Sequence, residues 1–257
     1  MSDDRSQEKL VDRQFGARAA AYLTSAVHAQ GADLSDLVAL VDATKKPRVL
    51  DLGCGGGHVS FNAAPRAREV VAYDLSEQML GVVAAAARER GLANLVTRQG
   101  VVERLPFDDQ SFDTVLSRFS AHHWLDLDAA LREAARVLKP GGVFGLVDSV
   151  TPGVPVLDTF LQTIELLRDP SHVRNYTRAE WDAAIGRAGL KLGAVAAYQL
   201  RLDFTSWVER MGTSTLHVDA IRSLGAGAPD VVERYFALGR DGSFNLDVGL
   251  FQATKPA

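Results

Sequence analysis

The sequence predicts an α/β fold with a mostly parallel β-sheet and helices on both of its faces. Between residues 48 and 147, short apolar segments alternate with longer segments of helical periodicity, a pattern typical of parallel strands joined by crossover helices. The first apolar segment runs directly into a glycine-rich turn at 53–57, and a helix is predicted after residue 57. In such sheets ligands bind beyond the carboxyl ends of the strands, so we expect the functional site there.

The elements of the first half follow from periodicity and from their start and stop signals. Residues 8–43 are rich in alanine and carry apolar residues such as Phe15 at helical spacing, which predicts one or two helices. Five apolar segments are predicted strands: 48–52, 69–73, 94–98, 112–117 and 143–147. One crossover helix is predicted from the N-cap Ser76 to Arg90, ended by Gly91, and another over 127–138.

The second half of the chain is less regular. Lys139-Pro140-Gly141-Gly142 is expected to break the chain sharply before the fifth strand, and an apolar-periodic segment follows Pro155. Thr177-Arg178-Ala179-Glu180 has the form of a capping box and predicts a helix to about Ala188. The remaining predicted elements are a strand near 191–202, short helices between 204 and 238, and a last strand near 243–253.

Composition and charge argue against several kinds of partner. The net charge of −4 comes from interspersed acids and bases, so the chain has no basic footprint for nucleic acid. The polar start of the sequence lacks the apolar segment of a secretory signal, and the longest apolar runs are far shorter than a membrane span. Cys54 is the single cysteine, which excludes an intramolecular disulfide. We expect a soluble cytoplasmic protein without membrane insertion.

The glycine-rich turn discriminates between classes of cofactor. Glycine allows a sharp turn and a close backbone approach to a ligand, because no Cβ is in the way. A dinucleotide fingerprint requires glycines at its first, third and sixth positions; counted from Gly53, the third is Gly55 but the sixth is His58. No Gly-Lys-Ser/Thr sequence indicates a nucleoside triphosphate loop. Asp74 closes the second strand, where it can accept both hydroxyls of an adenosine-type ribose.

Four motifs occur in the order and at the separations of a known family: Leu50-Asp51-Leu52-Gly53-Cys54-Gly55, then Asp74, then Leu105-Pro106-Phe107 with Phe112-Asp113, then Leu138-Lys139-Pro140-Gly141-Gly142. In these motifs the chain resembles the class I S-adenosylmethionine (AdoMet)-dependent methyltransferases, and it is similar to the ubiquinone/menaquinone biosynthesis type. The resemblance implies the Rossmann-like methyltransferase fold, with a seven-stranded sheet whose last strand is antiparallel. It also implies an enzyme that methylates a small molecule at oxygen, carbon or nitrogen.

We expect one methyltransferase domain over residues 1–257, present as a monomer or homodimer. Within it, the resemblance is clearest over 46–148, which we expect to form the cofactor-binding core. Residues 8–43 are expected to form an N-terminal helical cap. Residues 154–176 are expected to cover the substrate.

The resemblance implies contacts to the methionine portion and the ribose of AdoMet. The backbone around Gly53, Cys54 and Gly55 would hold the methionine portion. Its ammonium would face carbonyls near Asp51 and Gly53. Asp74 would bind the ribose hydroxyls.

At the adenine end the chain departs from the family pattern. Leu75 and Met79 would pack on the adenine, although Met79 is equally well placed to be a core residue of its helix. The family commonly has an acid after the glycine that follows strand three, where this chain has Val101, which cannot accept a hydrogen bond through its side chain. Adenine recognition is then expected from the Val102 backbone, with Glu103 either a further contact or a solvated carboxylate.

The segment after the fourth strand lies where the family brings substrate against the methyl group. A base is needed there only if the nucleophile arrives protonated, and imidazole titrates near neutral pH. His123 and His122 are the candidates, in that order; neighbours in a turn point differently, so at most one is expected to face the pocket. Arg118 either contacts cofactor or substrate or pairs with an acid. No metal site is expected, because no further ligand set has suitable spacing.

A second polar cluster is a candidate for binding an anionic substrate group. Arg168, His172, Arg174 and Tyr176 fall in one segment, and guanidinium groups bind carboxylates bidentately. The alternative is a solvated connection between elements. Tyr22 would close over the pocket from the N-terminal helices, or belong to the core.

Two other functions stay open. A nicotinamide-dependent oxidoreductase would bind NAD(H), against which His58 at the sixth position argues. A non-catalytic AdoMet-binding protein would keep the same motifs without turnover.

Overall fold

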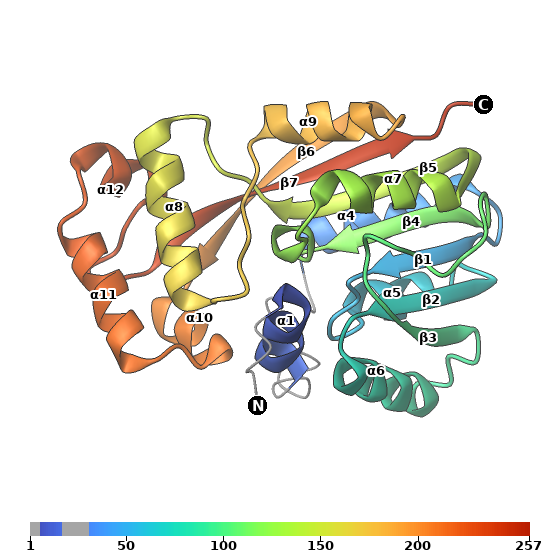
Figure 1. The fold of residues 1–257 in the computed structure, drawn as a ribbon, viewed down its shortest axis with the longest axis horizontal. Helices are drawn as coiled ribbons and strands as arrows, with labels where there is room; N and C mark the ends of the chain where they lie inside the picture. Colours follow the sequence, from blue (N-terminus) through green and yellow to red (C-terminus); the bar gives the residue numbers. More distant parts are fainter. Residues whose placement is uncertain (1–5, 17–30) are drawn as a thin grey trace.

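The computed structural model describes residues 6–16 and 31–257 and is built on a seven-stranded β-sheet in the order β3-β2-β1-β4-β5-β7-β6 (Figure 1). The strands are β1 (Arg48–Leu52), β2 (Glu69–Asp74), β3 (Leu95–Gln99), β4 (Phe112–Arg118), β5 (Leu138–Ser149), β6 (Lys191–Leu202) and β7 (Phe244–Thr254). Strands β1 to β5 pair in parallel, whereas β7 is antiparallel to both β5 and β6. The predicted fold class, including the antiparallel last strand, is confirmed.

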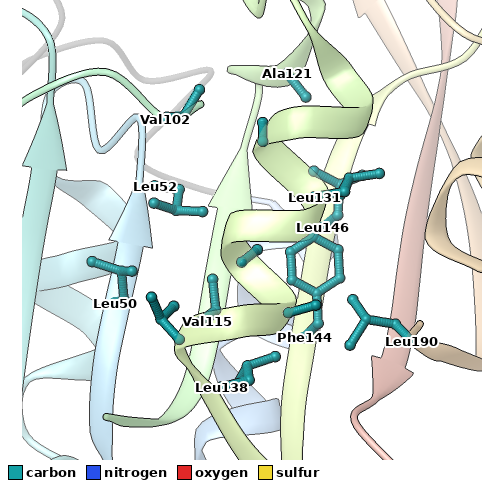
Figure 2. Close-up of a cluster of buried hydrophobic side chains, with 14 of the residues drawn as sticks. Leu50, Leu52, Val102, Val115, Ala121, Leu131, Leu138, Phe144, Leu146 and Leu190 are labelled. Atoms are coloured by element: carbon teal, nitrogen blue, oxygen red, sulfur yellow. The ribbon is translucent and has the colours of Figure 1, made fainter. Parts of the chain in front are cut away.

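Helices cover both faces of the sheet because alternate strand residues point to opposite faces. In β1, Val49 packs into one cluster with α4 (Ala32–Ala39), α5 (His58–Ala63) and α6 (Glu77–Glu89). Leu50 and Leu52 pack into the other cluster, with α7 (Leu127–Val137) and α9 (Arg178–Arg187), part of which Figure 2 shows. Each fully buried leucine contributes about 1.5–3 kcal/mol to folding.

A group of four helices, here called the helical lobe, packs around the far ends of β6 and β7 (Figure 1). Its members are α8 (Pro155–Arg168), α10 (Phe204–Met211), α11 (Thr215–Ala226) and α12 (Asp230–Phe236). Trp207 and Phe244 form the centre of a separate apolar cluster there, with their rings 4.9 Å apart. The lobe is thus a second packed unit, continuous with the sheet through two long strands.

The N-terminal helix α1 (Gln7–Gly16) lies between the helical lobe and α6 (Figure 1). Gln14 Nε2 donates a hydrogen bond of 2.9 Å to the Met211 carbonyl of α10, so α1, which also contacts α6, connects the lobe to the part of the fold built on β1 to β3. The predicted helical region 8–43 contains α1, α4 and the 3-10 helix η1 (Leu40–Ala43). Tyr22 lies outside the described residues.

Two predicted helix starts are confirmed, and the predicted break lies inside a strand. Ser76 accepts a hydrogen bond from the Met79 N–H, and Thr177 forms a complete capping box with Glu180. Residues 139–142 belong to β5, but its register with β4 breaks there, from the Phe112–Leu138 pair to the Thr114–Val143 pair. Gly141 adopts φ +74° and donates its N–H to the Lys255 carbonyl.

Within the described part of the chain, the helices are too short or too polar to cross a lipid bilayer.

Candidate active site

A cavity of about 410 Å³, here called the larger cavity, opens at the carboxyl ends of β1, β2 and β4. This is the edge where the sequence predicts the site. The following residues with predicted roles line it: Asp51, Gly53, Cys54, Gly55, Asp74, Leu75, Met79, Val101, Val102, Arg118 and His123. The local strand–turn–helix signals therefore bring one set of residues together around a single space.

Asp51 is a buried wall residue whose carboxylate is only half satisfied. Its Oδ2 accepts a hydrogen bond of 2.6 Å from Ser60 Oγ, while Oδ1 is buried without a hydrogen-bond partner among the described residues. Burial raises the pKa of Asp51 to about 7, against the lowering effect of the Ser60 hydrogen bond. An unpaired carboxylate oxygen in such a place suits a cationic ligand group.

The glycine turn presents open backbone to the same cavity. Gly53 and Gly55 have φ of +67° and +48°. A Cβ on Gly53 would lie 1.8 Å from Ser120 Oγ, so the chain can pass there only without a side chain. A Cβ on Gly55 would meet no atom within 4 Å, which leaves its backbone approachable from the cavity.

Asp74 both supports this turn and faces the cavity. Its Oδ2 accepts the Gly55 N–H (2.9 Å) and its Oδ1 accepts the Ser76 N–H (3.0 Å). Burial raises its pKa, and these backbone hydrogen bonds lower it in part. Each carboxylate oxygen can accept a second hydrogen bond. Asp74 thus has unused acceptor capacity for a pair of hydroxyls.

The wall beyond Asp74 is mostly apolar. Met79 is almost fully buried, at 1% exposure, yet borders the cavity, so the two alternatives for it are compatible. The Tyr73 hydroxyl donates to the Val101 carbonyl (3.0 Å), which positions the segment holding Val101 and Val102. Glu103 borders the cavity too, but its Oε1 accepts the N–H groups of Leu125 and Asp126 at 3.0 and 3.4 Å.

Arg118 pairs with an acid, which is one of the two alternatives considered for it, and contact with a ligand stays a prediction. Its Nε donates to Asp33 Oδ2 (2.7 Å) in a buried ion pair that connects β4 to α4. Its guanidinium also lies over the Phe119 ring, 4.8 Å from the ring centroid. Because the residue also borders the larger cavity, it adds a positive charge to the wall.

The two adjacent histidines lie in η2 (Ala121–His123) and have different partners. His122 Nδ1 is 2.6 Å from Oδ1 of the buried Asp148. Burial alone would lower the pKa of His122, but the charge and hydrogen bond of Asp148 outweigh burial and raise it. Burial and the neighbouring His122 lower the pKa of His123 to about 4.

A second space of about 90 Å³, here called the smaller hollow, lies beside the larger cavity. Phe15, Phe119 and His123 line both spaces, so they form a shared wall. His122 and Arg168 border only the smaller hollow. Arg168 is held there by Glu165 (3.4 Å) and by the Trp207 carbonyl (3.0 Å).

The other described residues of the predicted substrate cluster line neither space; they are His172, Arg174 and Tyr176. His172 Nε2 is 3.0 Å from Gln162 Oε1, and burial lowers the pKa of His172 to about 2. Arg174 pairs with Glu180 (3.1 Å) and Asp158 (3.5 Å). Tyr176 packs edge-on against Trp181, with ring centroids 5.2 Å apart. A substrate role for these three stays a prediction that the geometry does not support.

The sequence predicts an N-terminal helical cap over the pocket, but it does not identify which α1 residues line the cavity, and it does not identify Asp148. Gln7, Glu8, Val11 and Phe15 of α1 line the larger cavity, and their spacing along one helix face was the available signal. Asp148, at the carboxyl end of β5, is recognisable only once the fold places it beside His122. Among the described residues, no group of three His, Cys, Asp or Glu side chains is arranged to hold a metal ion.

Comparisons with known proteins agree on one family. Residues 50–146 match the family model described as a methyltransferase domain. YafE of Escherichia coli K12, an uncharacterized protein, is 51% identical over 205 residues, which are 80% of this chain and 99% of YafE. YcgJ of Bacillus subtilis, an uncharacterized methyltransferase, is 39% identical over 77% of this chain and 79% of its own. The crystal structure of YcgJ has a TM-score of 0.84, with 36% identity over 88% of this chain and 98% of that one.

A more distant relative has a named role. UbiE of Bartonella henselae, a ubiquinone/menaquinone biosynthesis C-methyltransferase, is 38% identical over 115 residues, or 43% of this chain and 44% of UbiE. The sheet order and the antiparallel last strand are those of the Rossmann-like methyltransferase fold. The chain belongs to the class I AdoMet-dependent methyltransferases, and it is a methyl-transferring enzyme.

Proposed function

We propose that this enzyme takes its methyl group from AdoMet bound in the larger cavity and transfers it to a small-molecule acceptor. The observation that carries the proposal is Asp51, whose buried, unpaired Oδ1 borders the cavity directly before the glycine turn. The α-ammonium of AdoMet is a cation that would satisfy this oxygen. A nicotinamide dinucleotide has no comparable group at that end.

The other wall residues fit the remaining parts of AdoMet. Open backbone at Gly55 would receive the methionine portion, and Asp74 would accept the ribose hydroxyls. Leu75 and Met79 would pack on the adenine, and Val102 would contribute backbone hydrogen bonds. Arg118 supplies positive charge for the methionine carboxylate.

The enzyme's contribution to the reaction is mainly alignment. Bound AdoMet would supply a methyl group already activated by the sulfonium, for an in-line displacement. Phe15, Phe119 and His123 line both spaces, so an acceptor would approach the methyl group past these side chains. Holding the accepting atom in line with the methyl carbon and sulfur supplies most of the rate increase.

A small acceptor fits the space that the described residues leave. The smaller hollow of about 90 Å³ adjoins the larger cavity at Phe15, Phe119 and His123, and its lining includes apolar residues of β6 and β7 beside charged side chains. The relative UbiE is named for the biosynthesis of ubiquinone and menaquinone, which supports a small molecule rather than a macromolecule as the acceptor.

Calorimetry tests the choice of donor. AdoMet and S-adenosylhomocysteine are titrated into the protein, with NAD⁺ as the control ligand. We expect both adenosyl ligands to bind and NAD⁺ not to bind. Absence of heat from both adenosyl ligands at high micromolar concentration would refute the proposal, whereas binding without turnover over a broad acceptor panel would support a non-catalytic role.

Asp74→Ala tests the ribose contact. Loss of the acceptor for two buried hydroxyls should weaken S-adenosylhomocysteine binding by about 1–3 kcal/mol, roughly 5- to 150-fold. Asp42→Ala removes an exposed acid of η1 that pairs with Arg66 and does not line the larger cavity, and it is the matched control. Equal affinity in the two variants would remove Asp74 from the site.

A further inference from the structure

We propose that His122, held by Asp148, is the general base for a hydroxyl-bearing acceptor bound in the smaller hollow. This inference rests on the proposed function and adds the acceptor's compartment, its chemical class and the residue that takes its proton.

Asp148 holds His122 in place through its buried carboxylate. Its carboxylate is fully buried and accepts the N–H groups of Ala121 (2.8 Å), His122 (3.3 Å) and Ser149 (2.8 Å). Two of these donors belong to η2, the element that carries the imidazole. The carboxylate therefore sets the position of the His122 backbone as well as that of its ring.

The hydrogen bond to Asp148 determines which nitrogen of His122 can act as a base. Nδ1 lies 2.6 Å from the carboxylate and must be the protonated nitrogen, because the carboxylate accepts only. Nε2 then carries the lone pair, and none of the described residues hydrogen-bonds to it. The side chain is 17% exposed and borders the smaller hollow. A buried carboxylate that orients an imidazole in this way is the arrangement of hydrolase base pairs.

The neighbouring histidines are unsuited to the same task. His123 Nε2 faces Asp169 Oδ2 at 3.9 Å, and burial together with His122 lowers the pKa of His123 to about 4, which makes it a weak base. His172 Nε2 is engaged with Gln162 Oε1 (3.0 Å), and its Nδ1 is buried. The rings of these two histidines lie 4.2 and 5.8 Å from the His122 ring, so a charge on His122 disfavours a second charge on either. Asp148, Glu165 and Asp169 face the cluster with negative charge, and Arg168 borders the same hollow with positive charge. Of the three histidines, His122 is thus the one suited to accept the proton of the acceptor.

The remaining lining of the hollow indicates the kind of acceptor. Its apolar part is Leu200, Leu202 and Leu246 from β6 and β7 with Trp207, and its charged part is Glu165, Arg168, Asp169 and Arg210. Apolar side chains in the same hollow as a base suit a small apolar body that carries a weakly acidic hydroxyl, such as a phenol or an enol. A neutral amine needs no base before attack, so this arrangement favours an oxygen acid.

The step balances as a simple proton-coupled displacement. The acceptor oxygen gives its proton to His122 Nε2 while one of its lone pairs forms the new O–C bond to the methyl carbon. The C–S bond breaks, and its electron pair stays on sulfur, which leaves the neutral thioether S-adenosylhomocysteine. The positive charge moves from sulfonium to imidazolium, and His122 returns its proton to water after product release.

The test compares phenol with thiophenol, which have nearly the same shape, because thiophenol is largely ionised at pH 8 and needs no base. His122→Gln should lower kcat for phenol by about 10²- to 10⁴-fold, and for thiophenol by less than tenfold. S-adenosylhomocysteine affinity should stay within twofold. His217→Gln, a substitution in α11, should leave both activities unchanged.

A second readout does not require turnover. In ¹⁵N-imidazole NMR spectra of the ligand-free protein, His122 should be protonated at Nδ1 and titrate above its ordinary pKa. Asp148→Asn, if circular dichroism shows it folded, should lower that pKa and move the acidic limb of the phenol pH profile to lower pH.

Several results would overturn the inference. These are an equal loss for phenol and thiophenol in His122→Gln, a His122 proton on Nε2, or no turnover of either probe while S-adenosylhomocysteine still binds. Absence of S-adenosylhomocysteine binding in the unmodified protein would instead refute the proposed function itself.

Discussion

At the scale of single residues, Asp51 combines a cost to folding with a use in binding. Its carboxylate is buried, one of its oxygens has no hydrogen-bond partner, and burial raises its pKa to about 7. The folded pKa lies above the ordinary value of 3.8, so protonation is favoured by folding. The resulting stability is fully present below pH 4 and is lost as the pH rises through about 7.

Asp51→Asn should therefore change stability and binding in opposite directions. The neutral amide avoids burying a charge, so the variant should be more stable than the parent protein at pH 8, by about 3 kcal/mol, but not at pH 4. Affinity for S-adenosylhomocysteine should fall by about 1.5–3 kcal/mol, because the ligand ammonium loses its anionic partner. Urea unfolding at the two pH values and calorimetry check both effects. A stability difference that is the same at both pH values would contradict this account of Asp51.

At the scale of elements, the β1–α5 turn can be compared with a turn of similar backbone geometry. Gly55 and Gly91 have φ of +48° and +68°, and a Cβ on either would meet no atom within 4 Å. Gly91 follows α6 and does not border the larger cavity. The two positions thus share a conformation and differ in their relation to the ligand space.

Gly55→Ala and Gly91→Ala should lose similar stability but differ in binding. Each alanine must adopt the left-handed region, which costs about 1–2 kcal/mol. Only the methyl group at residue 55 blocks the backbone's approach to AdoMet, so we expect a loss of affinity of roughly tenfold or more there alone. Urea unfolding and S-adenosylhomocysteine titration of both variants measure this. Similar affinity in both would mean that the ligand does not contact the turn.

The same scale explains which predictions from sequence succeeded. The sequence locates strands β1 to β4 to within one residue, because each is a short segment of strand-forming residues with a local stop signal, as at Arg48–Leu52. The start of β5 was placed late, at 143 rather than Leu138, because the pairing through residues 139–142 depends on Lys255, far along the chain. Local patterns cannot contain that information.

The residues of the candidate site also fall into two groups, those that the sequence could place and those that it could not. Residues of the strand–turn–helix units, such as Asp51 and Asp74, were found because chain position alone places them at one edge of the sheet. Arg174 was expected to meet substrate, but helices α8 and α9 bring Asp158 and Glu180 to it. Which acids a loop arginine meets is decided by tertiary packing, so the sequence could not separate the binding role from the ion pair.

At the scale of the whole molecule, buried titratable groups act in opposite directions on stability. Folding raises the pKa of Asp51 and Asp74, mainly through burial, so acidification stabilises the fold through them. Folding lowers the pKa of His123 and His172 to about 4 and about 2, again mainly through burial. Their contribution is present above the ordinary value of 6.5 and is lost as the pH falls.

His172→Gln should shift this balance toward stability in acid. Below pH 6.5 the unfolded parent chain binds a proton at His172, whereas the folded protein does not, so the parent protein loses stability as the pH falls. The variant has no imidazole at this position and does not lose that stability. Relative to the parent protein, the variant should gain about 1–2 kcal/mol between pH 7.5 and pH 5. Urea midpoints across this range, with m-values compared, provide the measurement. Parallel pH profiles for the two proteins would contradict burial of a neutral His172.

Helix α1 contributes Phe15 to the lining of both the larger cavity and the smaller hollow, so ligands in the two spaces would contact the same ring. A first ligand that immobilises this ring leaves less ordering to be done by a second. Such linkage is reciprocal: the factor by which the acceptor tightens AdoMet equals the factor by which AdoMet tightens the acceptor. The enzyme would thus assemble a ternary complex cooperatively, and the reactive sulfonium would be most firmly enclosed only when a nucleophile is present to receive its methyl group.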